Sequence, residues 1–279
     1  MGIPIGSEVA GEARESPAIK REESVKFFMH QPLSLGAANP LAGLRVVGRE
    51  EECLMELDQK TVMKGLLEAN YRKEPYRFPA GHLFAPMIMG AALDRVEMEE
   101  LKMPSADLRF CSMTDARLTR VDMSAARAQE IGLSRSRLVE VNLDRSFLSR
   151  AVIRDTRFVR CSVNRLFVDK AEARGSRWED CRGERAVYDE ADFTGAVFER
   201  LALKNSTFTE ADLTGTRFED CDLEEVDFAL AVMWRTVFSN CRFKNCRFSG
   251  VQAHRLQFQG VDKESLKLSP LLLQNCEFE

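Results

Sequence analysis

The sequence predicts an all-β solenoid, because every fifth residue from Met103 to Phe258 is apolar, with Gly183 as the one exception. Two residues before the apolar positions the chain carries small or β-branched side chains almost throughout, among them Ala106, Cys111 and Val121. Neither an α-helix nor a flat strand has a period of five residues. A short fixed period is instead typical of repeat architectures, in which each unit buries its apolar residue against its neighbours.

Several five-residue segments carry a recognisable motif. Ala106-Asp107-Leu108-Arg109-Phe110, Ala191-Asp192-Phe193-Thr194-Gly195 and Ala211-Asp212-Leu213-Thr214-Gly215 resemble the A(D/N)LxG motif of pentapeptide repeat proteins. The resemblance runs from about Ala91 to Phe278, with Lys263 departing at a centre position. It implies a right-handed quadrilateral β-helix with four pentapeptides per coil, in which the centre residue and the small residue two positions before it point inward.

In coils of this size, centre residues twenty positions apart stack at the strand spacing of about 4.8 Å. Aromatic rings would then lie on one another in two columns. We expect about nine coils and a length of roughly 45 Å. The first column is Leu118, Leu138, Phe158, Trp178, Phe198, Phe218, Phe238 and Phe258, and the second is Tyr188, Phe208, Phe228 and Phe248.

The chain divides into three predicted parts. Residues 1–26 are polar and aperiodic, which is typical of a flexible tail. Residues 27–85 are expected to form an N-terminal cap or docking segment with one helix from Glu50 to about Tyr71, because a solenoid has an open apolar end; a separate functional domain is the competing interpretation. Residues 86–279 form the solenoid. We expect no signal peptide and no membrane insertion.

The residue patterns favour binding over catalysis. Seven of the eight cysteines lie in the inward small-residue series, where a thiol is a compact apolar filler. The three histidines are scattered and no CxxC occurs, so no metal site or cofactor is expected. No nucleophile elbow, phosphate-binding loop or HExxH is present, so the chain is not expected to be an enzyme.

Charge is unevenly distributed. Residues 101–180 carry 16 basic and 11 acidic side chains, whereas residues 181–279 carry 12 basic and 17 acidic ones. Arginines one presumed coil apart form two candidate basic binding ladders, and acidic residues further along form a candidate acidic surface. Screening by solvent and neighbouring acids is the alternative to a docking role. The first ladder is Arg117, Arg137, Arg157 and Arg177, the second is Arg145, Arg165 and Arg185, and the acidic surface is Asp192, Asp212, Glu199, Glu219 and Asp222.

Three functional hypotheses follow. The first is a non-enzymatic scaffold that presents charged faces to protein partners in the bacterial cytoplasm. The second comes from the resemblance: the quinolone-resistance branch of the family consists of acidic rods that mimic B-DNA and bind type II topoisomerases such as DNA gyrase, although the basic section 101–180 departs from that pattern. The third is an effector or accessory protein of a type VI or type III secretion system, exported without a signal peptide. No direct binding of nucleic acid is expected.

The C-terminal end is a candidate association site. The repeat continues to Leu271, Leu273, Cys276 and Phe278, and no amphipathic helix is expected to cover the last coil, although residues 262–268 are expected to loop out around Lys263. An open apolar coil with unpaired strand edges promotes association. We therefore expect an end-to-end homodimer or a bound partner at this end.

Overall fold

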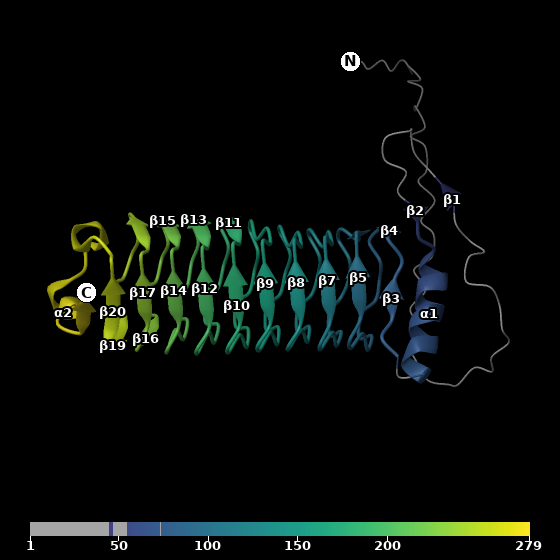
Figure 1. Ribbon diagram of the computed structural model, residues 1–279, viewed down its shortest axis with the longest axis horizontal. Helices are drawn as coiled ribbons and strands as arrows, with labels where there is room; N and C mark the ends of the chain where they lie inside the picture. Colours follow the sequence, from purple (N-terminus) through teal and green to yellow (C-terminus); the bar gives the residue numbers. More distant parts are fainter. Residues whose placement is uncertain (1–44, 47–54, 73) are drawn as a thin grey trace, which may run out of the picture. The chain divides into compact units, whose positions relative to one another are not determined.

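The computed structural model of the protein describes residues 45–46, 55–72 and 74–279. The predicted tail, residues 1–26, and most of the first half of the predicted cap lie outside these residues. The described part is a four-sided parallel β-solenoid with a helix at each end (Figure 1). The predicted fold class is confirmed.

The first side of the solenoid is one continuous parallel sheet. Each strand pairs with the strand twenty residues later, as in Arg137↔Arg157 and Phe198↔Phe218. Its eleven strands enclose ten coils, which is one more than predicted. In chain order they are β3 (Arg77–Phe78), β5 (Glu97–Glu99), β7 (Arg117–Thr119), β8 (Arg137–Val139), β9 (Arg157–Val159), β10 (Arg177–Glu179), β12 (Val197–Glu199), β14 (Arg217–Glu219), β17 (Val237–Ser239), β20 (Leu256–Gln259) and β21 (Cys276–Phe278).

The additional coil opens at Arg77, ahead of the expected boundary at residue 86. Phe78, Leu83, Ile88 and Leu93 already occupy its centre positions, and all four are buried. Pro79 and Pro86 lie within this coil and do not interrupt it.

The other three sides follow in chain order around each coil. The second side contains residues 81–85 and every twentieth residue after them, the third side residues 86–90, and the fourth side residues 91–95. The third side and most of the fourth are columns of isolated parallel bridges such as Met87↔Asp107 and Ala92↔Ser112. The strands are β4 (Gly81–His82), β6 (Leu101–Lys102), β11 (Arg182–Glu184), β13 (Ala202–Lys204), β15 (Asp222–Glu224) and β18 (Arg242–Lys244) on the second side, with β16 (Val232–Trp234) and β19 (Gln252–His254) on the fourth.

Each side ends in a residue with left-handed backbone conformation. Glu140, Arg145, Arg150 and Asp155, which end the four sides of one coil, have φ between 54° and 60°. This conformation crowds a Cβ atom and is usually left to glycine. The motif aspartate supports the turns: Asp212 Oδ1 accepts the Thr214 N–H at 2.9 Å, and equivalent Asp or Asn residues repeat the contact.

The predicted aromatic columns occupy the axis. Phe158 and Trp178 stack with their centroids 3.9 Å apart, Phe198 and Phe218 at 4.7 Å, and Tyr188 and Phe208 at 4.6 Å. The exception at Gly183 has a steric cause. A Cβ added there would lie 2.5 Å from the Val163 side chain, so no larger residue fits.

The inward small residues satisfy the backbone. Buried hydroxyls donate to carbonyl oxygens of the preceding coil, as from Ser136 to Met113 at 2.7 Å and from Thr156 to Leu133 at 2.6 Å. The inward cysteines direct their thiols in the same way, for example from Cys221 to Phe198 at 3.3 Å. All seven cysteines that the structure describes are free thiols.

The N-terminal helix lies across the first coil. α1 spans Gln59–Arg72 and begins after Asp58, whose carboxylate accepts the Thr61 N–H at 3.0 Å and thereby caps the helix. The helix was expected from Glu50 with acids in its first turn. The helix begins later, because β2 (Met55–Glu56) precedes it. β2 pairs antiparallel with β1 (Arg45–Val46) and parallel with β4. The first turn of the helix therefore contains no acidic residue.

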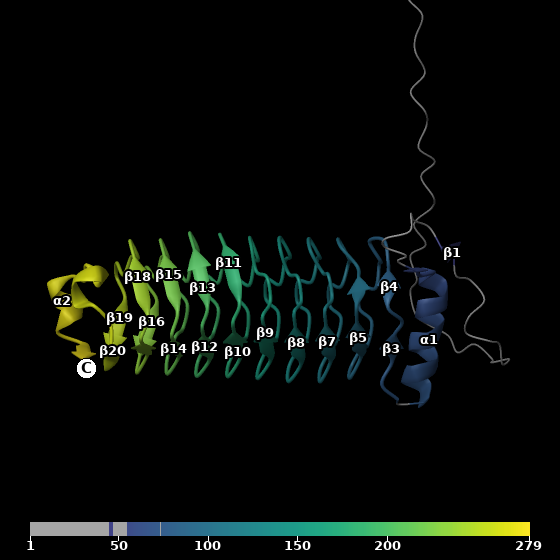
Figure 2. The same cartoon turned by 45° about the horizontal axis from the view of Figure 1, so that its top comes forward.

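Helix α1 closes the apolar end of the coil. Val62 and Leu66 are buried in the same core as Phe78 and Leu83, and Figures 1 and 2 both show α1 beside β3 and β4. Burial of each of these helix side chains stabilises the fold by about 1.5–3 kcal/mol. The packing supports the interpretation of this helix as a cap. No helix of the described residues is long and apolar enough to span a bilayer.

The C-terminal end differs from the prediction. A 3-10 helix η1 (Lys263–Leu266) and a one-turn helix α2 (Pro270–Leu273) precede β21. Ser269 caps α2 and Pro270 begins it, which breaks the five-residue period. Leu272 is therefore buried, whereas Leu271 is 73% exposed and lies on the helix surface. The expectation that Leu271 and Leu273 would keep the coil register was wrong.

Candidate functional site

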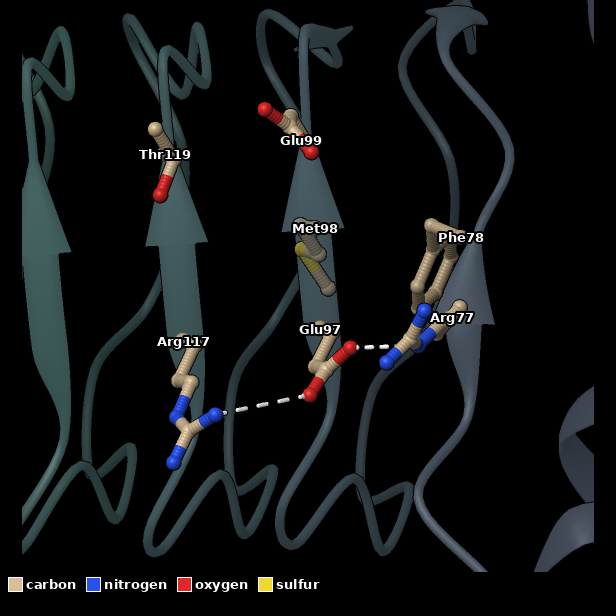
Figure 3. Close-up of a pocket in the computed structure, with 7 residues that line it drawn as sticks. All are labelled: Arg77, Phe78, Glu97, Met98, Glu99, Arg117 and Thr119. Carbon is tan, nitrogen blue, oxygen red and sulfur yellow. Dashed lines mark ion pairs between the residues drawn. The ribbon is translucent and has the colours of Figure 1, made fainter.

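A shallow pocket lies on the first side near the N-terminal end (Figure 3). Glu97 lies between two guanidinium groups there, 2.5 Å from Arg77 and 3.8 Å from Arg117. The remaining lining residues are Phe78, Met98, Glu99 and Thr119, so the pocket offers ion pairs but no histidine or cysteine. Among the described residues no cluster of His, Cys, Asp and Glu could hold a metal ion.

The first basic ladder is in register. Arg117, Arg137, Arg157 and Arg177 pair directly with one another on successive strands of the first side, and all four are exposed. Two of them have acidic partners: Arg157 contacts Glu179 at 2.6 Å, and Arg117 contacts Glu97. Within the described residues Arg137 and Arg177 form no ion pair. The ladder is thus only partly neutralised.

The second basic ladder lies at a corner. Arg145, Arg165 and Arg185 end the second side on three successive coils, with left-handed φ values of 60°, 53° and 58°. All three side chains are exposed. Arg185 contacts the neighbouring Glu184 at 3.6 Å, and no ion pair involves the other two within the described chain.

Most of the candidate acidic residues form ion pairs with neighbouring cations. Asp192 contacts Arg174 at 2.5 Å, and Glu199 pairs with Arg200. Asp212 accepts the turn N–H described above. Cations on the same coil or on a neighbouring coil therefore offset much of the acidic surface. The remaining two pairs are Glu219 with Arg217 and Asp222 with Arg242, both at 2.7 Å.

A further charged column lies at the corner that ends the first side, and we call it the alternating corner column. Its residues change sign from coil to coil, and each arginine contacts the acid one coil earlier. The pairs are Arg120 with Glu100 at 2.9 Å, Arg160 with Glu140 at 2.9 Å and Arg200 with Asp180 at 2.7 Å.

The repeat geometry agrees with a comparison of family models. The model described as the pentapeptide repeat region matches residues 181–258, where the five-residue period coincides with the observed coils. The chain is a pentapeptide repeat protein. No curated protein matches it in sequence.

Three solved structures are similar to this pentapeptide repeat protein at low identity. HetL, involved in heterocyst differentiation regulation in the cyanobacterium Nostoc sp. strain PCC 7120, is 13% identical, with 68% of this chain and 94% of HetL covered and a TM-score of 0.37. QnrB1, a plasmid-mediated fluoroquinolone resistance protein, is 14% identical, with 71% and 94% covered and a TM-score of 0.24. Rfr23 from the cyanobacterium Cyanothece 51142 is 12% identical, with 74% and 98% covered and a TM-score of 0.19.

Sequence reasoning missed one surface of this pentapeptide repeat protein, an apolar column on the third side. Phe147, Phe167 and Val187 follow one another in the bridge register and point outward. The two rings stack with centroids 5.0 Å apart and an interplanar angle of 8°. The sequence contained the information needed to find this surface. Its apolar residues occupy one outward position and recur every twenty residues, as the arginines of the two ladders do.

The candidate association end retains partial exposure. Cys276 and Phe278 pair with Leu256 and Phe258 in coil register, as predicted, and both are half-buried. Lys263 lies 4.8 Å above the Phe278 ring, so the loop around this lysine folds onto the last strand. Leu273 is half-buried, and whether this end associates stays a prediction.

Proposed function

We propose that this pentapeptide repeat protein is a non-enzymatic scaffold that binds protein partners through charged faces of its solenoid. The observation that carries the proposal is the first basic ladder, in which four exposed arginines are held in strict register and two of them have no acidic partner among the described residues. A rigid array of like charge favours an acidic partner surface and steers its approach.

The test is a pull-down from the native cell with the purified protein as bait, read by mass spectrometry. A matched bait carries Arg137→Glu, Arg157→Glu and Arg177→Glu, and a control bait carries Arg235→Glu and Arg255→Glu on another corner. The proposal requires a partner that the wild type and the control retain and the ladder variant loses. Loss of no partner, with all three proteins equally stable, contradicts it.

The second candidate is DNA mimicry towards a type II topoisomerase. The excess of acid over residues 181–279 favours it, and the likeness to QnrB1, a fluoroquinolone resistance protein, makes it testable. The ion pairs of the acidic candidates argue against it, because they reduce the negative field that a DNA mimic needs. Inhibition of supercoiling by DNA gyrase, removed by Asp212→Lys, Glu219→Lys and Asp222→Lys, would replace the scaffold proposal.

We also propose that the protein acts in the bacterial cytoplasm. A role in a type VI or type III secretion system is the alternative. Immunoblotting of cell and medium fractions, with and without a functional secretion apparatus, separates the two. Appearance in the medium that depends on the apparatus supports the secretion role.

A further inference from the structure

The apolar column on the third side lies between polar and charged residues of the same register. On its N-terminal side Arg127 pairs with Asp107 at 3.1 Å, and on its C-terminal side Arg247 pairs with Asp227 at 3.2 Å. Phe147, Phe167 and Val187 stand between these ion pairs, followed by Thr207. Phe147 is 38% exposed, and the residues that flank the column in this register, Arg127 and Thr207, are charged or polar.

The second basic ladder borders this column. Arg145 precedes Phe147 by two residues, and Arg165 precedes Phe167 in the same way, so each rung presents a cation beside an apolar group. The acidic side chains beside these residues accept hydrogen bonds from neutral serines. Asp144 accepts from Ser162 at 2.6 Å, and Asp169 accepts from Ser149 at 2.5 Å. The arginine charge beside the rings is therefore not cancelled by a contact ion pair.

The orientation of the rings limits what they can bind. Phe147 and Phe167 lie almost parallel, each with one face against the other, so they present their edges outward. Nucleobases bind aromatic side chains by stacking on exposed ring faces. The paired faces disfavour that mode, whereas ring edges suit contacts with aliphatic side chains.

The spacing selects the shape of the partner. Adjacent rings are 5.0 Å apart, so three apolar rungs extend over about 10 Å. Apolar residues at i, i+4 and i+7 of an α-helix span about 10.5 Å along its axis. Alternate residues of an extended strand would span about 13 Å over the same three contacts. A helix lying along the solenoid axis matches the rungs, and a strand does not.

We propose that the third side of the solenoid binds an amphipathic helix of a partner protein, with its apolar stripe on Phe147, Phe167 and Val187 and an adjacent acidic stripe facing Arg145 and Arg165. This inference rests on the proposed scaffold function and names one surface and one class of partner for it. The apolar rungs contribute affinity, and the arginines determine the charge and direction of the helix.

The test uses a fluorescent synthetic helix of about 18 residues, with leucines at i, i+4 and i+7 and an adjacent stripe of glutamates. A second peptide carries lysine in place of each glutamate. Fluorescence anisotropy is measured with the full chain and with three variants. These are Phe147→Thr with Phe167→Thr, which copies Thr207 of the same column; Arg145→Glu with Arg165→Glu; and Arg235→Glu, at a corner of the fourth side, as the matched control.

We expect the wild type and the control to bind the acidic helix, and the phenylalanine variant to lose affinity by about tenfold or more. The Arg145→Glu, Arg165→Glu variant should prefer the lysine peptide. Thermal unfolding of each variant confirms that these outward substitutions leave the fold intact. The inference is overturned if the wild type binds neither peptide, or if the phenylalanine variant binds as well as the wild type.

Two further outcomes separate this inference from its alternatives. If Arg137→Glu on the first ladder, measured in the same way, abolishes binding and the phenylalanine variant does not, the scaffold function stands through the first ladder and the third-side site is wrong. In the second experiment, a labelled single-stranded oligonucleotide takes the place of the peptide. Tight oligonucleotide binding that depends on Phe147 and Phe167 would show that this surface binds nucleic acid and not a helix of a partner protein.

Discussion

Removing one hydroxyl from the core should stabilise the protein. Tyr188 lies in a column whose later members are Phe208, Phe228 and Phe248, and its ring stacks on Phe208 at 4.6 Å. The side chain is fully buried, and among the described residues the hydroxyl oxygen has no hydrogen-bond partner. A buried hydroxyl without a partner costs about 1–3 kcal/mol. The substitution Tyr188→Phe keeps the ring and removes that cost.

The expected result is an increase of about 1–3 kcal/mol in the free energy of unfolding, measured by chemical denaturation. In thermal melts each kcal/mol corresponds to a rise of about 2–4 °C for a chain of this size. The control is Phe208→Tyr, which adds a hydroxyl one coil further along the same column and should destabilise by a similar amount. Unchanged or reduced stability in Tyr188→Phe would show that the hydroxyl is satisfied in solution and refute the reasoning.

The same residue predicts an alkaline effect. Burial raises the pKa of Tyr188, whereas a tyrosine in the unfolded chain titrates near 10. Above that pH the unfolded state loses a proton that the folded state keeps, so stability falls as pH rises. Tyr188→Phe should therefore lose stability less steeply than the wild type above about pH 10.

Three further predictions concern the corners, the ion pairs and the C-terminal end. Phe110→Gly should stabilise by about 1 kcal/mol in urea denaturation, because Phe110 is exposed and has a left-handed φ of 61°; a loss of stability would mean that the ring contributes more than the strain. Asp107→Asn should cost about 1–3 kcal/mol at neutral pH and progressively less as pH falls through the folded pKa of Asp107, because hydrogen bonds from Arg109 hold the pKa of this buried carboxyl below its usual range; a pH-independent difference would contradict it. Light scattering should show a larger species for the wild type than for Leu273→Asp, Phe278→Asp, and a monomer in both would show that the C-terminal residues cap themselves.

The repeat period was enough to predict the solenoid and its columns. Each inward position admits few residue types, so apolar and small residues recur at a fixed spacing. That spacing allows one stacking register, which places Phe198 next to Phe218 and Arg137 next to Arg157. The ladder positions follow from the same register. The sequence could not show which arginines are neutralised, because the contact between Arg157 and Glu179 depends on rotamers of long side chains.

The ends of the solenoid were predicted less well for a physical reason. Only local signals operate where the period stops, and several segments there are short. Asp58 and Ser269 each cap a helix, yet neither was used to place a helix start. The cap at Ser269 changes the side-chain period from five to 3.6 residues per turn, which buries Leu272 in place of its neighbours.

The alternating corner column has a consequence for how the chain finds its register. Any coil of this solenoid could stack on almost any other, since nearly every centre position is apolar and the corners share a left-handed backbone conformation. If one coil were skipped during folding, Glu140 would face Glu100, and Arg120 would be expelled with its coil. Skipping two coils would leave Asp180 beside Arg120 and every other pair intact. Skipping an odd number of coils therefore brings like charges together in the column, whereas skipping an even number does not. Misfolded species and length variants of this protein should therefore differ from it by forty residues more readily than by twenty.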